Sequence, residues 1–346
     1  MKRREFVMCI AAAAGAGWRA GAAARPLLGL TVNFPEGGSE KDVGKGLVLA
    51  RDLGVRACTV GYMWKDVELK PGVYNLKGLD KALRGFGAFG FRVCVTLRTL
   101  DTNNRVLPAD LQDKPFDSEA MRERFDSLVE AIAPRLTDHV ACILLANEPD
   151  IYLARHADEL EAFAGLAERG RQRLRTLRPG LPVGVATTFN GLRDRPRLAE
   201  RLNRSMDILA LTYYPLAQKM MVRPVSEVAG DFEKMAEAAG GKQLVLKEIG
   251  YPADPRLGSS EDQQAAFVDA VFDAVEKHAA KISIFNFFVL YDFESRLVDM
   301  MARYYGVSDG NFRAYLSTLG LKRADGTPRQ AWARFEARAK ALLSSQ

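Results

Sequence analysis

Eight short apolar runs, each followed by an amphipathic segment, set the strongest limit on what this chain can fold into. A run of about four to eight apolar residues bounded by turn residues is typical of a strand buried on both faces, and such strands alternate with helices in parallel sheets. We therefore expect strands at Leu27–Val32, Val55–Val60, Arg92–Leu97, Val140–Ala146, Pro182–Thr187, Met206–Leu211, Gln243–Lys247 and Ile282–Phe288.

The segments between these runs carry apolar residues at helical spacing. Ser118 is expected to cap the N-terminus of one helix, and Ser259 or Ser260 that of another. The expected helices are Lys41–Leu53, Leu79–Phe89, Ser118–Arg135, Asp158–Leu177, Pro196–Asn203, Val225–Ala239, Ser260–Ala280 and Thr327–Leu343.

Eight strand–helix units fit a closed barrel better than an open doubly wound sheet. No Gly-x-Gly-x-x-Gly turn follows the first run, which argues against a dinucleotide-binding sheet. The chain has 346 residues, enough for one barrel of about 250 residues with insertions. No linker rich in Pro, Gly or Ser divides it. The sequence predicts an α/β fold, a single (β/α)8 TIM barrel over residues 25–346.

The loops that follow the strands are longer than the turns that lead into them. The long segments Gly61–Gly78, Thr99–Asp117 and Tyr291–Phe312 all come after expected strands. In parallel barrels the loops at the C-terminal ends of the strands carry the functional site. We therefore expect elaborated βα loops and a site on that face.

Residues 1–24 have the features of an export signal. Arg3 and Arg4 precede an Ala-rich apolar stretch, and Ala22-Ala23-Ala24 offers a cleavage site. This segment resembles a twin-arginine signal, and Trp18 and Arg19 leave its apolar part too short to span a bilayer. We expect a periplasmic or secreted protein without stable membrane association after cleavage. A disordered cytosolic N-terminus is the alternative.

The charge balance does not point to a nucleic-acid partner. The chain carries 49 basic and 43 acidic residues, and residues 1–24 hold four of the basic and one of the acidic ones. The remainder therefore has 45 basic and 42 acidic residues, a net charge of +3, with the two signs interspersed.

Cysteine and histidine give no sign of a metal centre. Cys58, Cys94 and Cys142 each lie in an apolar run, where free buried thiols are expected and one Cys58–Cys94 bridge is the alternative. The 3 histidines show no ligand spacing. We expect neither a metal nor a cofactor.

Two glutamates, Glu148 and Glu248, each come at the end of an apolar run. A carboxylate in this position leaves the core and stands at the rim of the barrel. Two facing carboxylates about 5–5.5 Å apart are the catalytic groups of retaining glycosidases, with one protonated acid and one ionised nucleophile. For either residue alone, a solvated surface charge is the simpler interpretation.

The surrounding motifs make a specific resemblance. Asn147-Glu148-Pro149 and Lys247-Glu248-Ile249-Gly250-Tyr251-Pro252 resemble the retaining clan A of barrel glycoside hydrolases, the cellulase and endo-galactanase superfamily. The resemblance implies that Glu148 is the acid/base, Glu248 the nucleophile, and Asn147 a ligand of the sugar 2-hydroxyl. For Asn147, capping of the following helix is the alternative.

Further candidate substrate-binding residues follow from the same resemblance. Arg56, in Gly54-Val55-Arg56, resembles the arginine that hydrogen-bonds the nucleophile, although pairing with a structural carboxylate is an alternative. Tyr213 and Tyr214 cannot both point into the barrel, because successive strand residues point to opposite faces, and the resemblance to the clan motif favours Tyr214. Other candidates are aromatic residues that could stack on sugar rings, or belong to the core instead, and one asparagine: Trp64, Tyr251, Phe288, Tyr291 and Asn33.

Three positions depart from the pattern of the clan. Many relatives have histidine where Thr212 stands and tryptophan at the end of the eighth strand, and endo-galactanases usually have glycine where Ala146 stands. We also expect an Arg98–Asp101 ion pair, and loop charges at Asp150 and Asp292.

The resemblance implies cleavage of β-linked oligo- or polysaccharides by double displacement. A barrel that binds carbohydrate without cleaving it is one alternative. A barrel enzyme of other chemistry, such as an isomerase or lyase, is the second, but no phosphate-binding glycine loop supports it.

Overall fold

The computed structural model describes residues 25–344, and in this part of the chain the eight expected strands form one closed parallel barrel. Each strand pairs with the next in the chain, and the last pairs with the first, so the sheet has no edge within the ring. In chain order the strands are β1 (Leu27–Leu30), β2 (Ala57–Met63), β5 (Arg92–Arg98), β8 (Val140–Asn147), β9 (Val183–Thr188), β10 (Ile208–Tyr213), β11 (Gln243–Ile249) and β12 (Ile282–Phe287).

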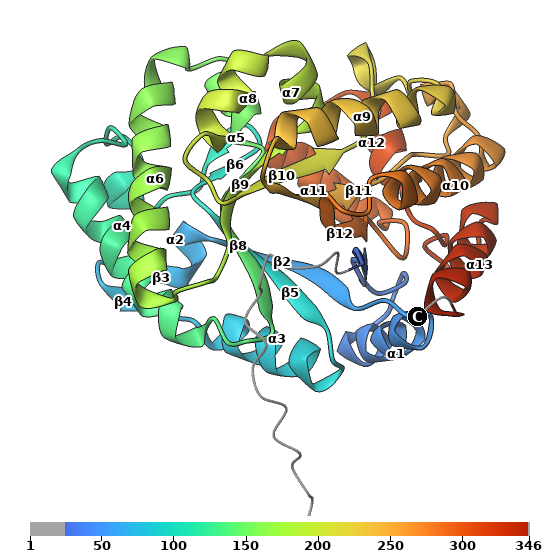
Figure 1. Ribbon diagram of the computed structural model, residues 1–346, viewed down its shortest axis with the longest axis horizontal. Helices are drawn as coiled ribbons and strands as arrows, with labels where there is room; N and C mark the ends of the chain where they lie inside the picture. The colour runs from blue at the N-terminus through green and yellow to red at the C-terminus, as the bar shows by residue number, and fades with distance from the viewer. Residues whose placement is uncertain (1–24, 345–346) are drawn as a thin grey trace, which may run out of the picture.

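A ring of helices surrounds the strands (Figure 1), which confirms the predicted TIM barrel. Ser118 and Ser260 accept hydrogen bonds from backbone N–H groups of their helices, as expected for N-caps. The principal helices are α1 (Glu40–Asp52), α3 (Lys77–Ala88), α4 (Glu119–Ile132), α6 (Leu160–Leu177), α8 (Pro196–Asn203), α9 (Val228–Ala239), α10 (Glu261–Lys277) and α13 (Gln330–Ser344).

The ring is closed where α13 meets the end of α1. A Cβ placed on Gly54 would lie 3.3 Å from the Leu343 side chain, so the two segments are in contact there. Gly54 has φ +86°, a left-handed conformation that lets the chain turn from α1 into β2. Helices from the two ends of the described chain thus lie side by side (Figure 1).

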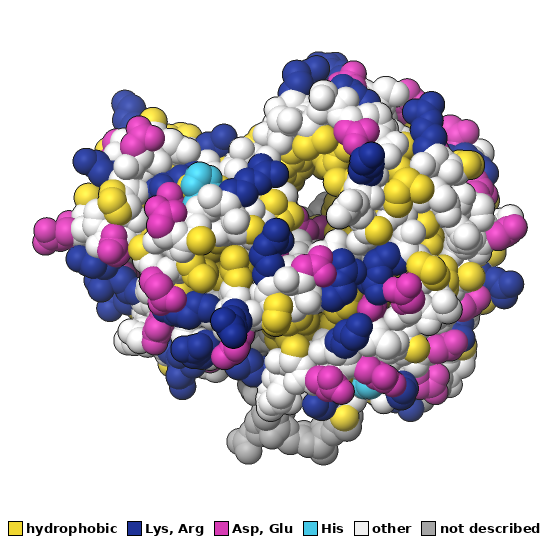
Figure 2. All heavy atoms as spheres, turned by 90° about the horizontal axis from the view of Figure 1, so that it is seen from above, with side chains coloured by type: hydrophobic (Ala, Val, Ile, Leu, Met, Phe, Trp, Pro, Cys, Tyr) yellow, Lys and Arg dark blue, Asp and Glu magenta, His cyan; other side chains and the backbone are white. Residues whose placement is uncertain are grey.

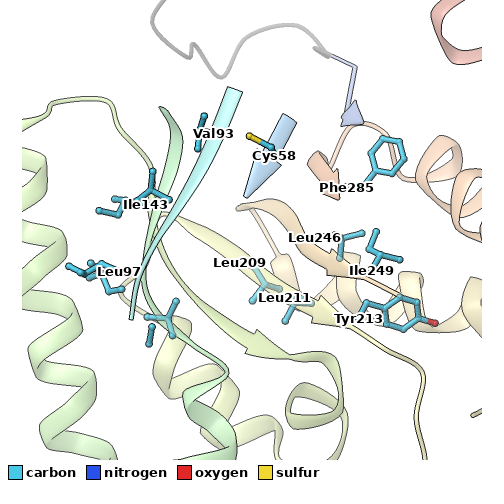
Figure 3. Packing of buried hydrophobic residues seen from close by; sticks show 14 of the residues in the cluster. Cys58, Val93, Leu97, Ile143, Leu209, Leu211, Tyr213, Leu246, Ile249 and Phe285 are labelled. Carbon is cyan, nitrogen blue, oxygen red and sulfur yellow. The ribbon is translucent and has the colours of Figure 1, made fainter. Parts of the chain in front are cut away.

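The core has two layers, one inside the barrel and one between the barrel and the helices. The inner layer is built of smaller side chains, among them Cys94, Cys142 and Ala186. The outer layer is larger, and Figure 3 shows several of its members, such as Leu97 and Phe285, pointing toward the surrounding helices. Alternation along each strand sends successive side chains to the two layers, which explains why the runs are apolar throughout.

The three cysteines in the described residues are free and buried, as predicted. Cys58 belongs to the outer layer and Cys94 to the inner one, so the alternative Cys58–Cys94 bridge is wrong. Instead, Cys94 faces Cys142 on the neighbouring strand, with the two sulfur atoms 3.1 Å apart.

The βα loops carry most of the structure outside the regular barrel. The segments after β2 and β5 contain short hairpins, those after β8 and β9 begin with short helices, and the segment after β12 contains two helices. These elements are α2 (Trp64–Val67), β3 (Glu68–Lys70), β4 (Val73–Tyr74), β6 (Leu100–Asp101), β7 (Asn104–Arg105), α5 (Pro149–Leu153), α7 (Phe189–Asp194), α11 (Ser295–Tyr305) and α12 (Gly310–Leu316).

One face of the molecule shows no dominant charge (Figure 2). On the face that Figure 2 shows, basic and acidic side chains are interspersed, as the sequence predicted. No helix of the described residues is long and apolar enough to cross a membrane. The residues expected to form the export signal lie outside the described part of the chain.

Candidate active site

Glu148 and Glu248 lie at the C-terminal mouth of the barrel, at the ends of β8 and β11. Glu148 follows β8 directly and begins α5 in a left-handed conformation, with φ 51° and ψ 41°. Non-glycine residues rarely adopt this conformation because it is energetically unfavourable. Such strained residues are often found at functional sites. Thr102, which contacts Glu148, also has a positive φ, of 57°.

Two threonine hydroxyls hold Glu148. Thr212 Oγ1 donates to Oε1 at 2.7 Å, and Thr102 Oγ1 donates to Oε2 at 3.0 Å. A hydroxyl can also accept, so both contacts persist when the carboxyl is protonated. Burial, assisted by the charge of Glu248, raises the pKa of Glu148 to about 7.

Glu248 is held by groups that stabilise its charged form. Lys247 Nζ lies 2.5 Å from Oε1, and the Tyr214 hydroxyl donates to Oε2 at 2.8 Å. Burial by itself would raise the pKa of Glu248, but Lys247, Tyr214 and the charge of Arg98 together lower it below its ordinary value. The site therefore contains one carboxyl poised to carry a proton near neutral pH and one that stays ionised.

The side chain of Asn147 is fixed at both ends. Its Nδ2 donates to Asp101 Oδ1 at 2.9 Å, and its Oδ1 accepts a hydrogen bond from Lys247. Asp101 is fully buried, forms the predicted ion pair with Arg98 at 3.2 Å, and accepts from the Tyr304 hydroxyl at 2.9 Å. Asn147 does not cap α5, whose N-cap is Glu148, so the capping alternative is wrong.

Helices α11 and α12 place tyrosines over the two carboxylates. Asn103 Nδ2 donates to Tyr305 O at 2.8 Å, and Asn104 Nδ2 donates to Tyr304 O at 3.1 Å, which docks the end of α11 on the turn between β6 and β7. From α12, Tyr315 packs against Tyr214 with ring centroids 5.5 Å apart. Burial raises the pKa of these phenols, so they act as neutral hydroxyls.

A separate apolar cluster supports helices α11 and α12. It packs α11 and α12 against the loops that follow β10 and β11, apart from the two barrel layers. Its fully buried members include Leu257, Ala302 and Leu316. The tyrosines therefore belong to a packed element with a core of its own.

The prediction that Arg56 hydrogen-bonds the nucleophile is wrong. Arg56 precedes β2, at the opposite end of the barrel, where its backbone N–H donates to Leu28 O at 2.8 Å. Its guanidinium donates to the carbonyls of Arg51 and Val55. Arg98, at the end of β5, is the arginine whose charge reaches Glu248.

Two of the predicted aromatic platforms belong to the core. Trp64 is fully buried, and its Nε1 donates to Glu68 Oε2 at 2.6 Å. Tyr251 is 2% exposed, stacks on Phe267, and donates its hydroxyl to Arg223 O at 2.9 Å. Neither can stack on a sugar ring, because protein atoms already cover both faces.

The other candidates lie at the mouth of the barrel. Phe288 is half-buried and packs edge-on against Tyr214, with ring centroids 6.3 Å apart. Asn33 accepts from Tyr291 N at 2.9 Å and donates to Tyr291 O at 2.8 Å, so its side chain joins the loop after β1 to that after β12. Asn33 orders two loops, whereas Phe288 borders the carboxylates through Tyr214.

Asp150 and Asp292, which were expected as loop charges, are both buried. Asp150 is 3% exposed and accepts from both the backbone and the hydroxyl of Thr188. Asp292 is 4% exposed and pairs with Arg329 at 2.6 Å. Burial raises the pKa of each to about 6.

Several groups around the carboxylates were not predicted as site residues. Thr212 was noticed only as a departure from the clan, and Lys247 was assigned to the strand. Thr102 and the tyrosines of α11 and α12 had no signal beyond their position in long βα loops. Among the described residues, no group of three or more His, Cys, Asp or Glu side chains is arranged to hold a metal ion.

Comparison with known proteins finds similarity in structure alone. No protein-family model and no curated protein sequence matches this chain. An exo-beta-1,4-mannosidase from Opitutaceae bacterium strain TAV5 superposes with a TM-score of 0.72 at 18% identity, covering 93% of this chain and 60% of the mannosidase. This chain thus spans less than two thirds of that protein's length.

Two further neighbours extend the comparison. A GH5_18 protein from Streptomyces cattleya, solved in complex with GlcNAc, has a TM-score of 0.74 at 16% identity, covering 94% of this chain and 82% of that one. A family 39 glycoside hydrolase from Bacteroides cellulosilyticus WH2 has a TM-score of 0.65 at 16% identity, covering 92% and 64%. The structural neighbours are clan A barrel glycoside hydrolases, the class that the motifs resemble. At these identities the likeness shows the fold.

Proposed function

We propose that this protein is an exported retaining glycoside hydrolase that cleaves β-linked oligo- or polysaccharides. Glu148 is the acid/base and Glu248 the nucleophile. The observation that carries the proposal is the opposite environment of the two carboxylates: burial and the charge of Glu248 favour a protonated Glu148, while Lys247 and Tyr214 favour an ionised Glu248. A retaining glycosidase requires this division of roles.

The reaction takes two steps. Glu248 attacks the anomeric carbon as the bond from that carbon to the leaving oxygen breaks, and Glu148 gives its proton to that oxygen. The product is a glycosyl ester on Glu248 and an ionised Glu148. Glu148 then takes a proton from water, the hydroxide attacks the anomeric carbon, and the ester bond breaks to restore Glu248.

The test compares wild type with Glu148→Gln and Glu248→Gln on aryl β-glycosides and β-glycans. Aryl β-mannosides come first, because one neighbour is a mannosidase and a variant of another was solved with Manb1-4GlcNAc. Both substitutions are expected to lower kcat/KM by at least about 10³-fold. Asp292→Asn, which alters a buried carboxylate outside the site, is the control and is expected to keep the activity.

A mechanism-based 2-fluoro glycoside adds the covalent step. Mass spectrometry of a digested, inactivated sample is expected to find the sugar on Glu248. If wild type hydrolyses no glycoside but binds a glycan as tightly as both variants do, the protein is a carbohydrate-binding barrel and the proposal fails. Inversion of the anomeric centre, followed by NMR, would overturn the double displacement.

Export has its own test. We propose that residues 1–24 direct the chain out of the cytoplasm through their paired arginines. The full chain is expected in the periplasm or medium of a bacterial host, shortened at its N-terminus. Replacement of Arg3 and Arg4 by lysine is expected to hold the precursor in the cytoplasm. Equal distribution of both forms would contradict the proposal.

A further inference from the structure

Lys247 is a buried cation at the centre of the candidate site. Its side chain is 2% exposed, and its ammonium lies between Glu248 Oε1, at 2.5 Å, and Asn147 Oδ1. A buried ammonium is costly unless partners compensate it, and removal of either partner leaves an uncompensated charge. A lysine in this place therefore calls for an explanation beyond packing.

An irregularity in the barrel directs Lys247 into the site. Along β10 and β11, Leu211 pairs with Leu246 but Thr212 pairs with Glu248, so Lys247 is an extra residue in β11. Such bulges re-aim side chains next to functional sites. In a regular strand Lys247 and Glu248 would point to opposite faces, whereas here the ammonium touches both the adjacent carboxylate and an amide on β8.

We infer that Lys247 is a positioning residue of the proposed reaction: its ammonium orients the Glu248 carboxylate for attack and fixes the amide of Asn147. This inference rests on the proposed function and deepens it. Lysine only donates and ionised Asp101 only accepts, so the amide is held with Oδ1 toward Lys247 and Nδ2 toward Asp101. The orientation of Asn147 thus depends on Lys247.

The same ammonium affects both steps through the charge balance of the site. With Glu148 protonated, Lys247 and Arg98 oppose Glu248 and Asp101, two charges of each sign. The other titratable groups that face the carboxylates are neutral tyrosine hydroxyls, those of Tyr214, Tyr304, Tyr305 and Tyr315, and the buried carboxyl of Asp150.

Formation of the glycosyl ester removes the charge of Glu248 and leaves Lys247 without its anion. The charge of Lys247 already lowers the pKa of Glu148, while that of Glu248 raises it. Loss of the Glu248 charge therefore favours an ionised Glu148 at the moment when it must act as a base. Lys247 thus supports attack in the first step and the change of role in the second.

The experiment substitutes the ammonium with a neutral chain of similar length. Lys247→Met is expected to lower kcat/KM about 10²-fold and to move the acidic limb of its pH profile to higher pH, because Glu248 then protonates more readily. Lys247→Arg keeps the charge and is expected to leave the acidic limb near its wild-type position. If Lys247→Met does not fold, Lys247→Gln replaces it, and the same changes in kcat/KM and in the acidic limb are expected.

Lys242→Met is the matched control. Lys242 stands just before β11, at the other end of the barrel, and its ammonium donates to the carbonyls of Asn203 and Arg204. This variant is expected to keep both the rate and the pH profile. A neutral Lys247 variant with kcat/KM within threefold of wild type and an unmoved acidic limb would overturn the inference. If that result comes while Glu148→Gln and Glu248→Gln are inactive, the proposed function survives it; inactivity of wild type itself would instead remove the proposed function.

Discussion

Thr212 donates a hydrogen bond to Glu148 from a strand two places further round the barrel, with Oγ1 and Oε1 2.7 Å apart. Thr102 reaches the other oxygen of the same carboxyl from the turn between β6 and β7. The acid of the proposed reaction is therefore held from two sides by neutral hydroxyls. The nucleophile, by contrast, is held by a cation and a phenol.

Removal of the Thr212 hydroxyl tests its effect on Glu148. That hydrogen bond lowers the pKa of Glu148, so Thr212→Val is expected to raise it and to move the basic limb of kcat/KM to higher pH. We expect kcat/KM at neutral pH to fall about tenfold from loss of orientation. Thr99→Val is the control, since Thr99 is equally buried but donates to Leu145 O. A basic limb that stays in place would contradict this role.

The pH profile of wild type follows from the two carboxyls. The proposed reaction requires a protonated Glu148 and an ionised Glu248. Because the pKa of Glu148 is raised to about 7, kcat/KM is expected to decline above about pH 7, and because the pKa of Glu248 is lowered, the acidic decline is expected only well below neutrality. Glu148→Gln, assayed on a glycoside with a good leaving group, is expected to lose the basic limb. Retention of that limb would assign it to another group.

The same raised pKa makes stability depend on pH. The pKa of Glu148 is about 7 in the folded protein against 4.5 for the free side chain. Between these values the folded state holds a proton that the unfolded chain has lost. The stabilisation is complete below about pH 4.5 and is lost as pH rises through 7, a difference of about 3 kcal/mol. Asp150 and Asp292, with pKa values raised to about 6, act in the same direction.

Urea denaturation of wild type and Glu148→Gln at pH 5 and pH 8 measures how much Glu148 contributes to the pH dependence of the free energy of unfolding. The variant is expected to lose less stability between the two conditions than wild type, because its amide does not titrate. An equal loss in both proteins would show that Glu148 is not the group responsible.

The two arginines assigned differently by sequence and structure can be separated by mutation. Arg98→Met is expected to lower kcat/KM at least tenfold and to move the acidic limb to higher pH, because Arg98 lowers the pKa of Glu248 and pairs with Asp101. Arg56→Met is expected to keep kcat/KM within about twofold, because its guanidinium bonds only backbone carbonyls at the far end. The reverse order of effects would contradict the placement of both residues.

Trp64 is expected to matter for stability and not for binding. Trp64→Phe removes the donor to Glu68, a carboxylate that also accepts from Gly72 N and pairs with Arg124. We expect a loss of about 1–3 kcal/mol in the free energy of unfolding, with KM unchanged. Leu69→Ala, an exposed position of the same hairpin, is expected to change neither quantity. A raised KM in Trp64→Phe would restore its role as a sugar platform.

The barrel could be predicted because its strands are buried on both faces. Each strand is therefore an apolar run in the sequence, and every expected run overlaps a strand of the barrel. Glu148 and Glu248 could be located for the same reason, since a carboxylate at the end of such a run has to leave the core. The position of Arg56 could have been excluded in the same way. Arg56 lies near the start of a run, and the start of a barrel strand lies away from the mouth.

The remainder of the site depends on tertiary structure. Lys247 reaches Glu248 through a one-residue shift in strand pairing that no local pattern indicates. Trp64 and Tyr251 were interpreted as rim residues because they lie in loops, but those loops fold back and bury both side chains. The tyrosines of α11 and α12 lie on helices that were not predicted, and these helices are stabilised by packing against residues far away in sequence, such as Leu216 and Leu257.

The left-handed backbone at position 148 affects which residues can replace Glu148 during evolution. Glycine or asparagine would occupy φ 51° at less cost than glutamate, so selection for folding alone would favour their appearance there. A raised carboxyl pKa at the same position works against stability above neutral pH as well. Directed evolution for thermal tolerance without an activity screen should therefore discard this glutamate early, which makes its retention a sensitive record of what the protein has been selected to do.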